Sequence, residues 1–167
     1  METWDEVVLQ SGVPSNSFLT MRSYSDETTM ALVEAASNVL KLSANDCLSV
    51  FGRYWVSRFA PKEYGKLLDH TGGSLMEFFQ NLDALHDRIS TSFTEFKPPS
   101  FKVKMKTANS AVIRYVSSRK GLTPFVIGII TGIGERFDTA IHIDAVDSST
   151  SDQGEVSDIL ISMAPNG

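Results

Sequence analysis

The sequence is organised around residues 73 to 89, which read GSLMEFFQNLDALHDRI. Ser74 and Glu77 have the spacing of a capping box, in which the two side chains satisfy free backbone N–H groups at the start of a helix. Apolar residues then recur at steps of three and four, as on the buried side of an amphipathic helix. They are Leu75, Phe79, Leu82, Leu85, Ile89 and Phe93. We therefore predict one helix from Ser74 to Phe93.

His86 lies on the apolar side of this helix, one turn after Leu82 and one turn before Ile89. Its imidazole is therefore expected to point into the protein. Such a histidine is either a core residue whose ring nitrogens bond to backbone carbonyls, or an axial ligand to a metal or a haem. The spacing alone leaves both explanations open.

Composition and charge exclude several classes of protein. The chain has 167 residues, 42% of them hydrophobic, which is enough for a buried core. Its net charge of -5 and scattered Lys and Arg exclude a nucleic-acid backbone as partner. The longest apolar run, Phe125 to Ile133, is too short to span a membrane. A single cysteine, Cys47, and the lack of an export signal lead us to expect a cytoplasmic location.

The pattern changes from helix to strand at Pro98-Pro99, because a double proline cannot continue a helix. Helical periodicity fills the chain before this point. After it we expect strands at 101–106 and 111–119, a helix at 123–137 capped by Thr123, and strands at 139–146 and 156–163 separated by a polar loop. We predict an α+β fold in one domain, residues 1–167. A helical subdomain, residues 1–95, would pack on a four-stranded antiparallel sheet with one inserted helix, residues 96–167.

Three polar residues share one face of the second expected strand. Tyr115, Ser117 and Arg119 are two positions apart, so their side chains leave the same face at intervals of about 7 Å. Ala111 and Ile113 precede them on that face and are apolar. Two hydroxyls and a guanidinium can together bind carboxylates, and such charge-assisted bonds survive partial burial. The alternative is a polar strand face that contacts only solvent.

Two segments resemble haem nitric oxide/oxygen binding (H-NOX) domains. The segment YVSSR, residues 115–119, matches the Tyr-x-Ser-x-Arg signature of that family. The segment NLDALHD, residues 81–87, is similar to the proximal-histidine segment of soluble guanylate cyclase and its bacterial relatives. Their separation and the PPSF element between them, residues 98–101, are also similar to the family's arrangement.

The resemblance implies a role for each of these residues. His86 would be the fifth ligand of the iron in haem b, iron protoporphyrin IX. Tyr115, Ser117 and Arg119 would bind the haem propionates. Pro99 would press against the porphyrin and help to distort it. The residues alone predict an inward histidine and a carboxylate-binding strand, and the name of the cofactor comes from the resemblance.

The resemblance also implies which gas is sensed. In this family a distal tyrosine accompanies stable O₂ binding, and its absence accompanies discrimination in favour of NO. The matching positions resemble Phe125 and Trp55. Phe125 cannot donate a hydrogen bond, whereas Trp55 has an indole N–H but is better explained as a core aromatic. We therefore expect a sensor of NO, with CO as a second ligand, that is not an enzyme. It would report to a separate histidine kinase or cyclic-dinucleotide enzyme.

One departure from the family leaves other readings open. Family members usually begin with an additional helix that covers the distal face of the haem, and this sequence starts after the position of that helix. Two alternatives follow: a binder of another tetrapyrrole, or a cofactor-free adaptor that uses the surface left by the missing helix. An uncovered apolar surface would also favour a homodimer.

Overall fold

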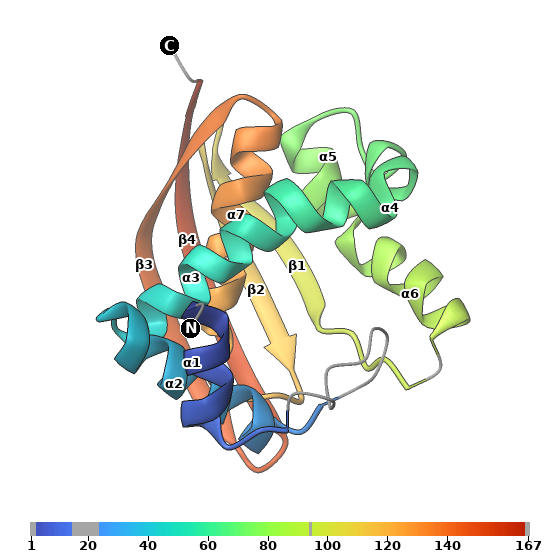
Figure 1. Ribbon diagram of the computed structural model, residues 1–167. Helices are drawn as coiled ribbons and strands as arrows, with labels where there is room; N and C mark the ends of the chain where they lie inside the picture. The colour runs from blue at the N-terminus through green and yellow to red at the C-terminus, as the bar shows by residue number, and fades with distance from the viewer. Residues whose placement is uncertain (1–2, 15–23, 94, 166–167) are drawn as a thin grey trace.

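A computed structural model describes residues 3–14, 24–93 and 95–165. The helical part contains α1 (Thr3–Ser11), α2 (Asp26–Leu40), α3 (Ala44–Tyr54), the π-helical segment η2 (Trp55–Phe59), α4 (Ala60–Asp69), α5 (Leu75–Gln80) and α6 (Leu82–Ser92). The remainder contains β1 (Ser100–Thr107), β2 (Ser110–Ser117), α7 (Thr123–Arg136), β3 (Thr139–Ser151) and β4 (Gly154–Pro165). This order, shown in Figure 1, confirms the predicted α+β fold.

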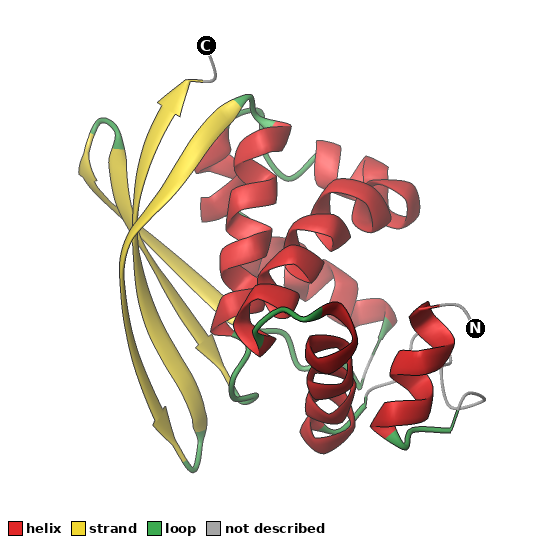
Figure 2. Ribbon diagram, turned by 60° about the vertical axis from the view of Figure 1, so that its left-hand side comes forward, coloured by secondary structure: helices red, strands yellow, loops and turns green. Residues whose placement is uncertain are grey.

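The four strands form one antiparallel sheet in the order β1-β2-β4-β3. Figure 2 shows that the helices lie on one face of this sheet. Alternate residues of β2 and β4 point to that face and are buried, as the period of two requires. They are Ala111, Ile113, Tyr115, Ser117, Ser157, Ile159 and Ile161. The other face carries polar pairs such as Arg114 with Asp158, whose side chains form two hydrogen bonds of 2.7 and 2.6 Å.

Helix α7 lies between the sheet and α3, and glycines allow these elements to approach closely. A Cβ atom at Gly128 would collide with the carbonyl oxygen of Ser49 on α3 and would lie 2.9 Å from the backbone nitrogen of Arg53. A Cβ at Gly134 would lie 2.7 Å from the carbonyl oxygen of Thr139 on β3. Glycine therefore sets the backbone spacing on both sides of α7.

The predicted single helix from Ser74 to Phe93 is wrong in one respect, because it is divided at Asn81. The capping residues behave as predicted: Ser74 accepts a hydrogen bond from the N–H of Glu77, and the Glu77 carboxylate accepts one from Gly73 N–H at 2.9 Å. Asn81 has φ −96° and ψ 4°, outside the helical range, and separates α5 from α6. Its side-chain amide donates to the carbonyl of Thr71 at 2.7 Å, which holds the break in place.

Three further boundaries differ from the predictions. Strand β2 ends at Ser117, so Arg119 lies beyond it. The segment predicted as a polar loop is strand instead, since β3 and β4 extend to Ser151 and Gly154. Serine and threonine are compatible with strand structure there because backbone pairing with β4 continues and Ser148 hydrogen-bonds to Ser157. Leu122, rather than Thr123, occupies the N-cap of α7.

The close contact between α3 and α7 gives a testable prediction. Gly128→Ala should lower the free energy of unfolding by about 1–3 kcal/mol, because the added methyl group must force two backbones apart. Gly65→Ala on α4 is the matched control, since a Cβ there has no atom within 4 Å. The control should be neutral or should stabilise the protein by up to about 1 kcal/mol. Urea unfolding of both variants measures the effect, and equal stability would contradict the packing argument.

Candidate functional site

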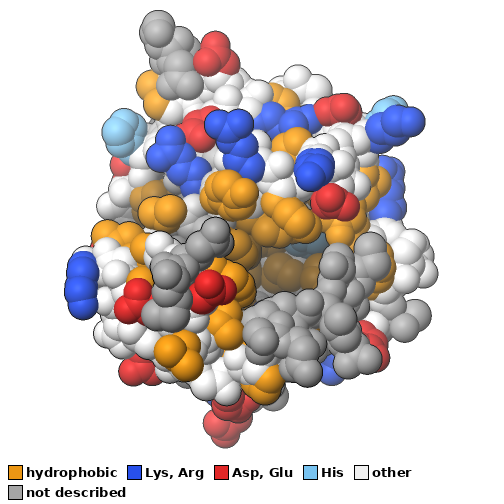
Figure 3. Space-filling model, in the orientation of Figure 1, with side chains coloured by type: hydrophobic (Ala, Val, Ile, Leu, Met, Phe, Trp, Pro, Cys, Tyr) orange, Lys and Arg blue, Asp and Glu red, His pale blue; other side chains and the backbone are white. Residues whose placement is uncertain are grey.

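His86 lies on α6 and faces the start of β1. Its Nδ1 is 3.2 Å from the carbonyl oxygen of Pro99, and this geometry fits an Nδ1–H that donates to the carbonyl. The bond assigns the proton to Nδ1 and leaves Nε2 with an available lone pair. His86 is partly buried, and Figure 3 shows a hollow between α3 and α6 around which hydrophobic side chains gather. The predicted inward orientation of the imidazole is therefore observed, together with a carbonyl partner for one nitrogen.

The surroundings of His86 favour its neutral form. Burial lowers the pKa of His86 below its usual value, although the Pro99 carbonyl and the nearby carboxylates of Asp83 and Asp87 act in the opposite direction. An imidazole with a lowered pKa favours its neutral form, with one N–H and one nitrogen lone pair. This is the form that a metal ion requires from a histidine ligand.

A series of aromatic rings connects His86 to the predicted carboxylate-binding strand. The ring of Phe101 on β1 lies 5.8 Å from that of His86 and 5.5 Å from that of Tyr115, measured between centroids. Phe96 contacts His86 from another side at 6.1 Å. The structure thus brings together the segments 81–87 and 115–119, although they are far apart along the chain.

Asp83 positions α6 against β1, a role that the sequence did not reveal. Its carboxylate accepts hydrogen bonds from the backbone N–H of Phe101 at 2.6 Å, the hydroxyl of Ser100 at 3.0 Å and the ammonium of Lys102 at 2.6 Å. Burial alone would raise the pKa of Asp83, but these three bonds together lower it. Because Asp83 is one turn from His86, this contact fixes the height of the imidazole over the sheet.

Tyr115 and Ser117 are buried at the end of β2, with 2% and 8% of their surfaces exposed. Burial raises the pKa of Tyr115, so its hydroxyl retains the proton and can donate a hydrogen bond. Ser117 accepts a hydrogen bond from the backbone N–H of Arg119 at 3.0 Å. This bond holds the turn after β2, so Arg119 stays beside the other two residues although it is outside the strand.

The two predicted distal residues have different neighbours. Trp55, in η2, is partly buried, packs against the core and lies 6.1 Å from the ring of Phe59. Phe125, in the first turn of α7, lies 5.4 Å from the ring of Phe51 on α3. Trp55 therefore fits the reading of a core aromatic, while Phe125 lies where α3 and α7 meet.

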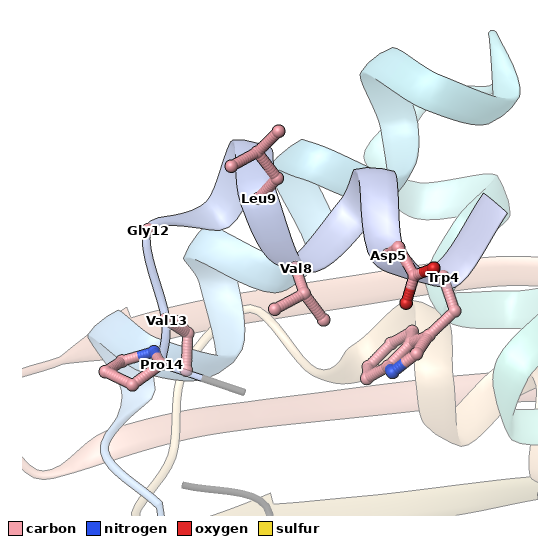
Figure 4. A pocket seen from close by; sticks show the side chains of 7 residues that line it. All are labelled: Trp4, Asp5, Val8, Leu9, Gly12, Val13 and Pro14. Carbon is pink, nitrogen blue, oxygen red and sulfur yellow. The ribbon is translucent and has the colours of Figure 1, made fainter. Parts of the chain in front are cut away.

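Two other hollows lie away from these residues. One, of about 420 Å³, is lined by Trp4, Asp5, Val8, Leu9, Gly12, Val13 and Pro14. Figure 4 shows Trp4 and Val8 on one side of α1, with Leu9 pointing to the other. The second, of about 490 Å³, runs along α4 from Pro61 to Asp69. Both are open, and neither contains a residue predicted for the site.

The side chains around His86 match the chemistry of a haem. An imidazole with a free Nε2 suits an axial iron ligand, an apolar hollow suits a porphyrin, and the buried hydroxyls of Tyr115 and Ser117 beside Arg119 suit carboxylate tails. Within the described ranges, no group of three or more His, Cys, Asp or Glu side chains is placed to hold a metal ion. A single protein ligand to iron is compatible with that finding.

Comparisons with known proteins agree with this chemistry. The haem-NO-binding family model matches residues 1–145. Soluble guanylate cyclase 89Da of Drosophila melanogaster is 31% identical over 137 residues, which are 82% of this chain and 20% of that protein. The guanylate cyclase soluble subunit beta-2 of Rattus norvegicus is 36% identical over 101 residues, 60% of this chain and 15% of that protein. The chain thus spans about a fifth of the length of these relatives or less.

Solved structures of H-NOX proteins share the fold. An unliganded Fe(II) mutant from K. algicida superposes with a TM-score of 0.81 at 24% identity, covering 99% of this chain and 88% of that one. An Fe(II) mutant from S. oneidensis gives a TM-score of 0.84 at 17% identity, covering 99% of this chain and 87% of that one. Because the family model covers most of the sequence, the chain belongs to the haem-NO-binding, or H-NOX, family of haem-based gas-sensing domains.

Proposed function

We propose that this protein binds haem b through His86 and senses nitric oxide on behalf of a separate signalling protein. The observation that carries the proposal is the hydrogen bond between His86 Nδ1 and the Pro99 carbonyl, at 3.2 Å. With the proton on Nδ1, the other ring nitrogen, Nε2, keeps the lone pair that an iron ligand needs. Membership of a haem-NO-binding family supports the cofactor and the general activity.

Each site residue has a proposed task. His86 holds the iron, and Tyr115, Ser117 and Arg119 bind the propionates. The Pro99 carbonyl accepts the hydrogen bond from His86 Nδ1–H, and Pro99 would press on the porphyrin. When bound, the haem supplies the iron that takes up the gas.

The signal would leave the site through α6. His86 is attached to the sheet by its bond to Pro99, and one turn earlier α6 is attached by Asp83. A change in the position of His86 would therefore shift α6 relative to β1 and alter the surface of α6. The receiver would be a histidine kinase, a cyclic-dinucleotide enzyme or, as the names of the relatives suggest, a guanylate cyclase. Self-association as a homodimer stays a prediction.

The choice of gas can be tested by absorption spectroscopy of the ferrous protein. We expect NO and CO to shift the haem band, and O₂ to form no stable complex, because Phe125 cannot donate a hydrogen bond to bound O₂. A persistent O₂ complex in air would contradict the proposed selectivity. If a complex did form, Trp55→Phe would show whether the indole N–H stabilises it.

His86→Gly tests the iron ligand. The variant should lose the five-coordinate ferrous spectrum and recover it when imidazole is added, because imidazole can occupy the vacated space. His70→Gly is the matched control: His70 is exposed, and its Nδ1 lies 2.6 Å from the Lys66 carbonyl. An unchanged spectrum in His86→Gly would exclude His86 as the ligand.

Arg119→Ala tests the binding of the propionates. Losing this cation should weaken haem binding by about 1.5–3 kcal/mol, because the carboxylates would keep only the hydroxyl donors. Transfer of haem to an apo acceptor protein should accelerate accordingly. Arg114→Ala on the outer face of the sheet removes an equal charge far from the inner face and should leave the rate unchanged. Equal rates for the two variants would place the propionates elsewhere.

A further inference from the structure

Arg119 is held by the first turn of α2, an element that the family signature does not include. Its Nε donates to Oδ1 of Asp26 at 2.5 Å, and its Nη2 donates to Oγ1 of Thr29 at 2.8 Å. These partners precede Arg119 by 93 and 90 residues. The side chains of Arg119 and Asp26 are 39% and 43% exposed, so the ion pair is neither fully buried nor fully solvated.

The first turn of α2 is itself held in place before it contacts Arg119. Ser25 caps the helix by accepting from the N–H of Thr28 at 3.2 Å. The hydroxyl of Thr29 donates to the carbonyl of Ser25 at 3.1 Å. Since that hydroxyl has a single proton, its lone pairs are left to accept from Arg119. The turn therefore offers two oriented acceptors, one charged and one neutral.

The two contacts leave part of the guanidinium available. Arginine has five N–H donors in a planar fork, and α2 takes the Nε proton and one Nη2 proton. Among the described residues, no other acceptor bonds to the guanidinium, which leaves both protons of Nη1 and the second proton of Nη2. The Nη1–Nη2 end of the fork can bind a carboxylate through two parallel bonds. Asp26 approaches the side of the fork, so its bond does not block that end.

We propose that Asp26 and Thr29 are positioning residues that hold the Arg119 guanidinium in the orientation in which it binds a propionate. This inference rests on the proposed function, because the carboxylate concerned is that of the haem. An arginine held by two acceptors loses less rotational freedom when its ligand arrives, so part of the ordering cost is already met in the cofactor-free protein. The first turn of α2 thereby becomes part of the cofactor site.

The experiment measures haem transfer from the loaded protein to an apo acceptor for Asp26→Ala, Asp26→Asn and Thr29→Val. Asp26→Ala should accelerate haem loss on the order of tenfold, the effect of losing one charge-assisted hydrogen bond. Asp26→Asn should give a smaller effect because its amide oxygen can still accept from Nε. Glu27→Ala is the matched control, since Glu27 is an exposed carboxylate in the same turn. It removes an equal charge near the helix end and should leave the rate unchanged.

A double variant separates positioning from a general structural effect. If Asp26 acts through Arg119, Asp26→Ala should add nothing in an Arg119→Ala background. Three outcomes would overturn the inference while leaving the proposed function in place. The first is haem loss from Asp26→Ala at the parental rate. The second is slower haem loss from that variant, which would mean that Asp26 competes with the propionate. The third is an additive effect on the rate in the double variant. If Arg119→Ala alone released haem at the parental rate, the propionate site of the proposed function would be wrong, and this inference with it.

Discussion

The contact between Asp83 and the start of β1 is the interaction on which the geometry of the site depends. It joins the helix that carries His86 to the strand whose entry carries Pro99. The carboxylate accepts from a backbone N–H, a hydroxyl and an ammonium, and charged acceptors of this kind make strong hydrogen bonds. Without this contact, α6 would be attached mainly through apolar packing, which does not fix a helix along its own axis.

Local signals predicted the fold well, while features that depend on distant partners escaped prediction. The cap at Ser74 and the change to a period of two after Pro99 are encoded within a few residues, and the structure has them. The break at Asn81 depends on the Thr71 carbonyl, ten residues away. The apolar periodicity continues through Asn81, so it predicted one unbroken helix. The outer half of β3 looked like a loop because its composition is polar, yet pairing with β4 decides its structure.

The same distinction applies to the site. The inward orientation of His86, Tyr115 and Ser117 could be predicted because a helix or a strand places them on a face whose direction follows from spacing alone. Asp26 and Asp83 resembled ordinary helix charges, since their partners lie 93 residues away at Arg119 and 18 away at Phe101. Sequence patterns identify residues that face a site. Residues that hold others in place are identified by their contacts, and such contacts are visible only in the folded structure.

The contacts around the site divide the helices into a rigid group and a group that can shift. Helices α3 and α7 meet backbone to backbone at Gly128, and close packing of this kind does not allow gradual sliding. Helices α6 and α2 instead reach the site through polar side chains, Asp83 on one and Asp26 on the other. The side chains of Asp83 and Asp26 are 27% and 43% exposed, so water or a ligand can reach them and replace one of these bonds if it is lost. On the proposed function, a change in the position of His86 would therefore be transmitted to α6 more easily than to α3.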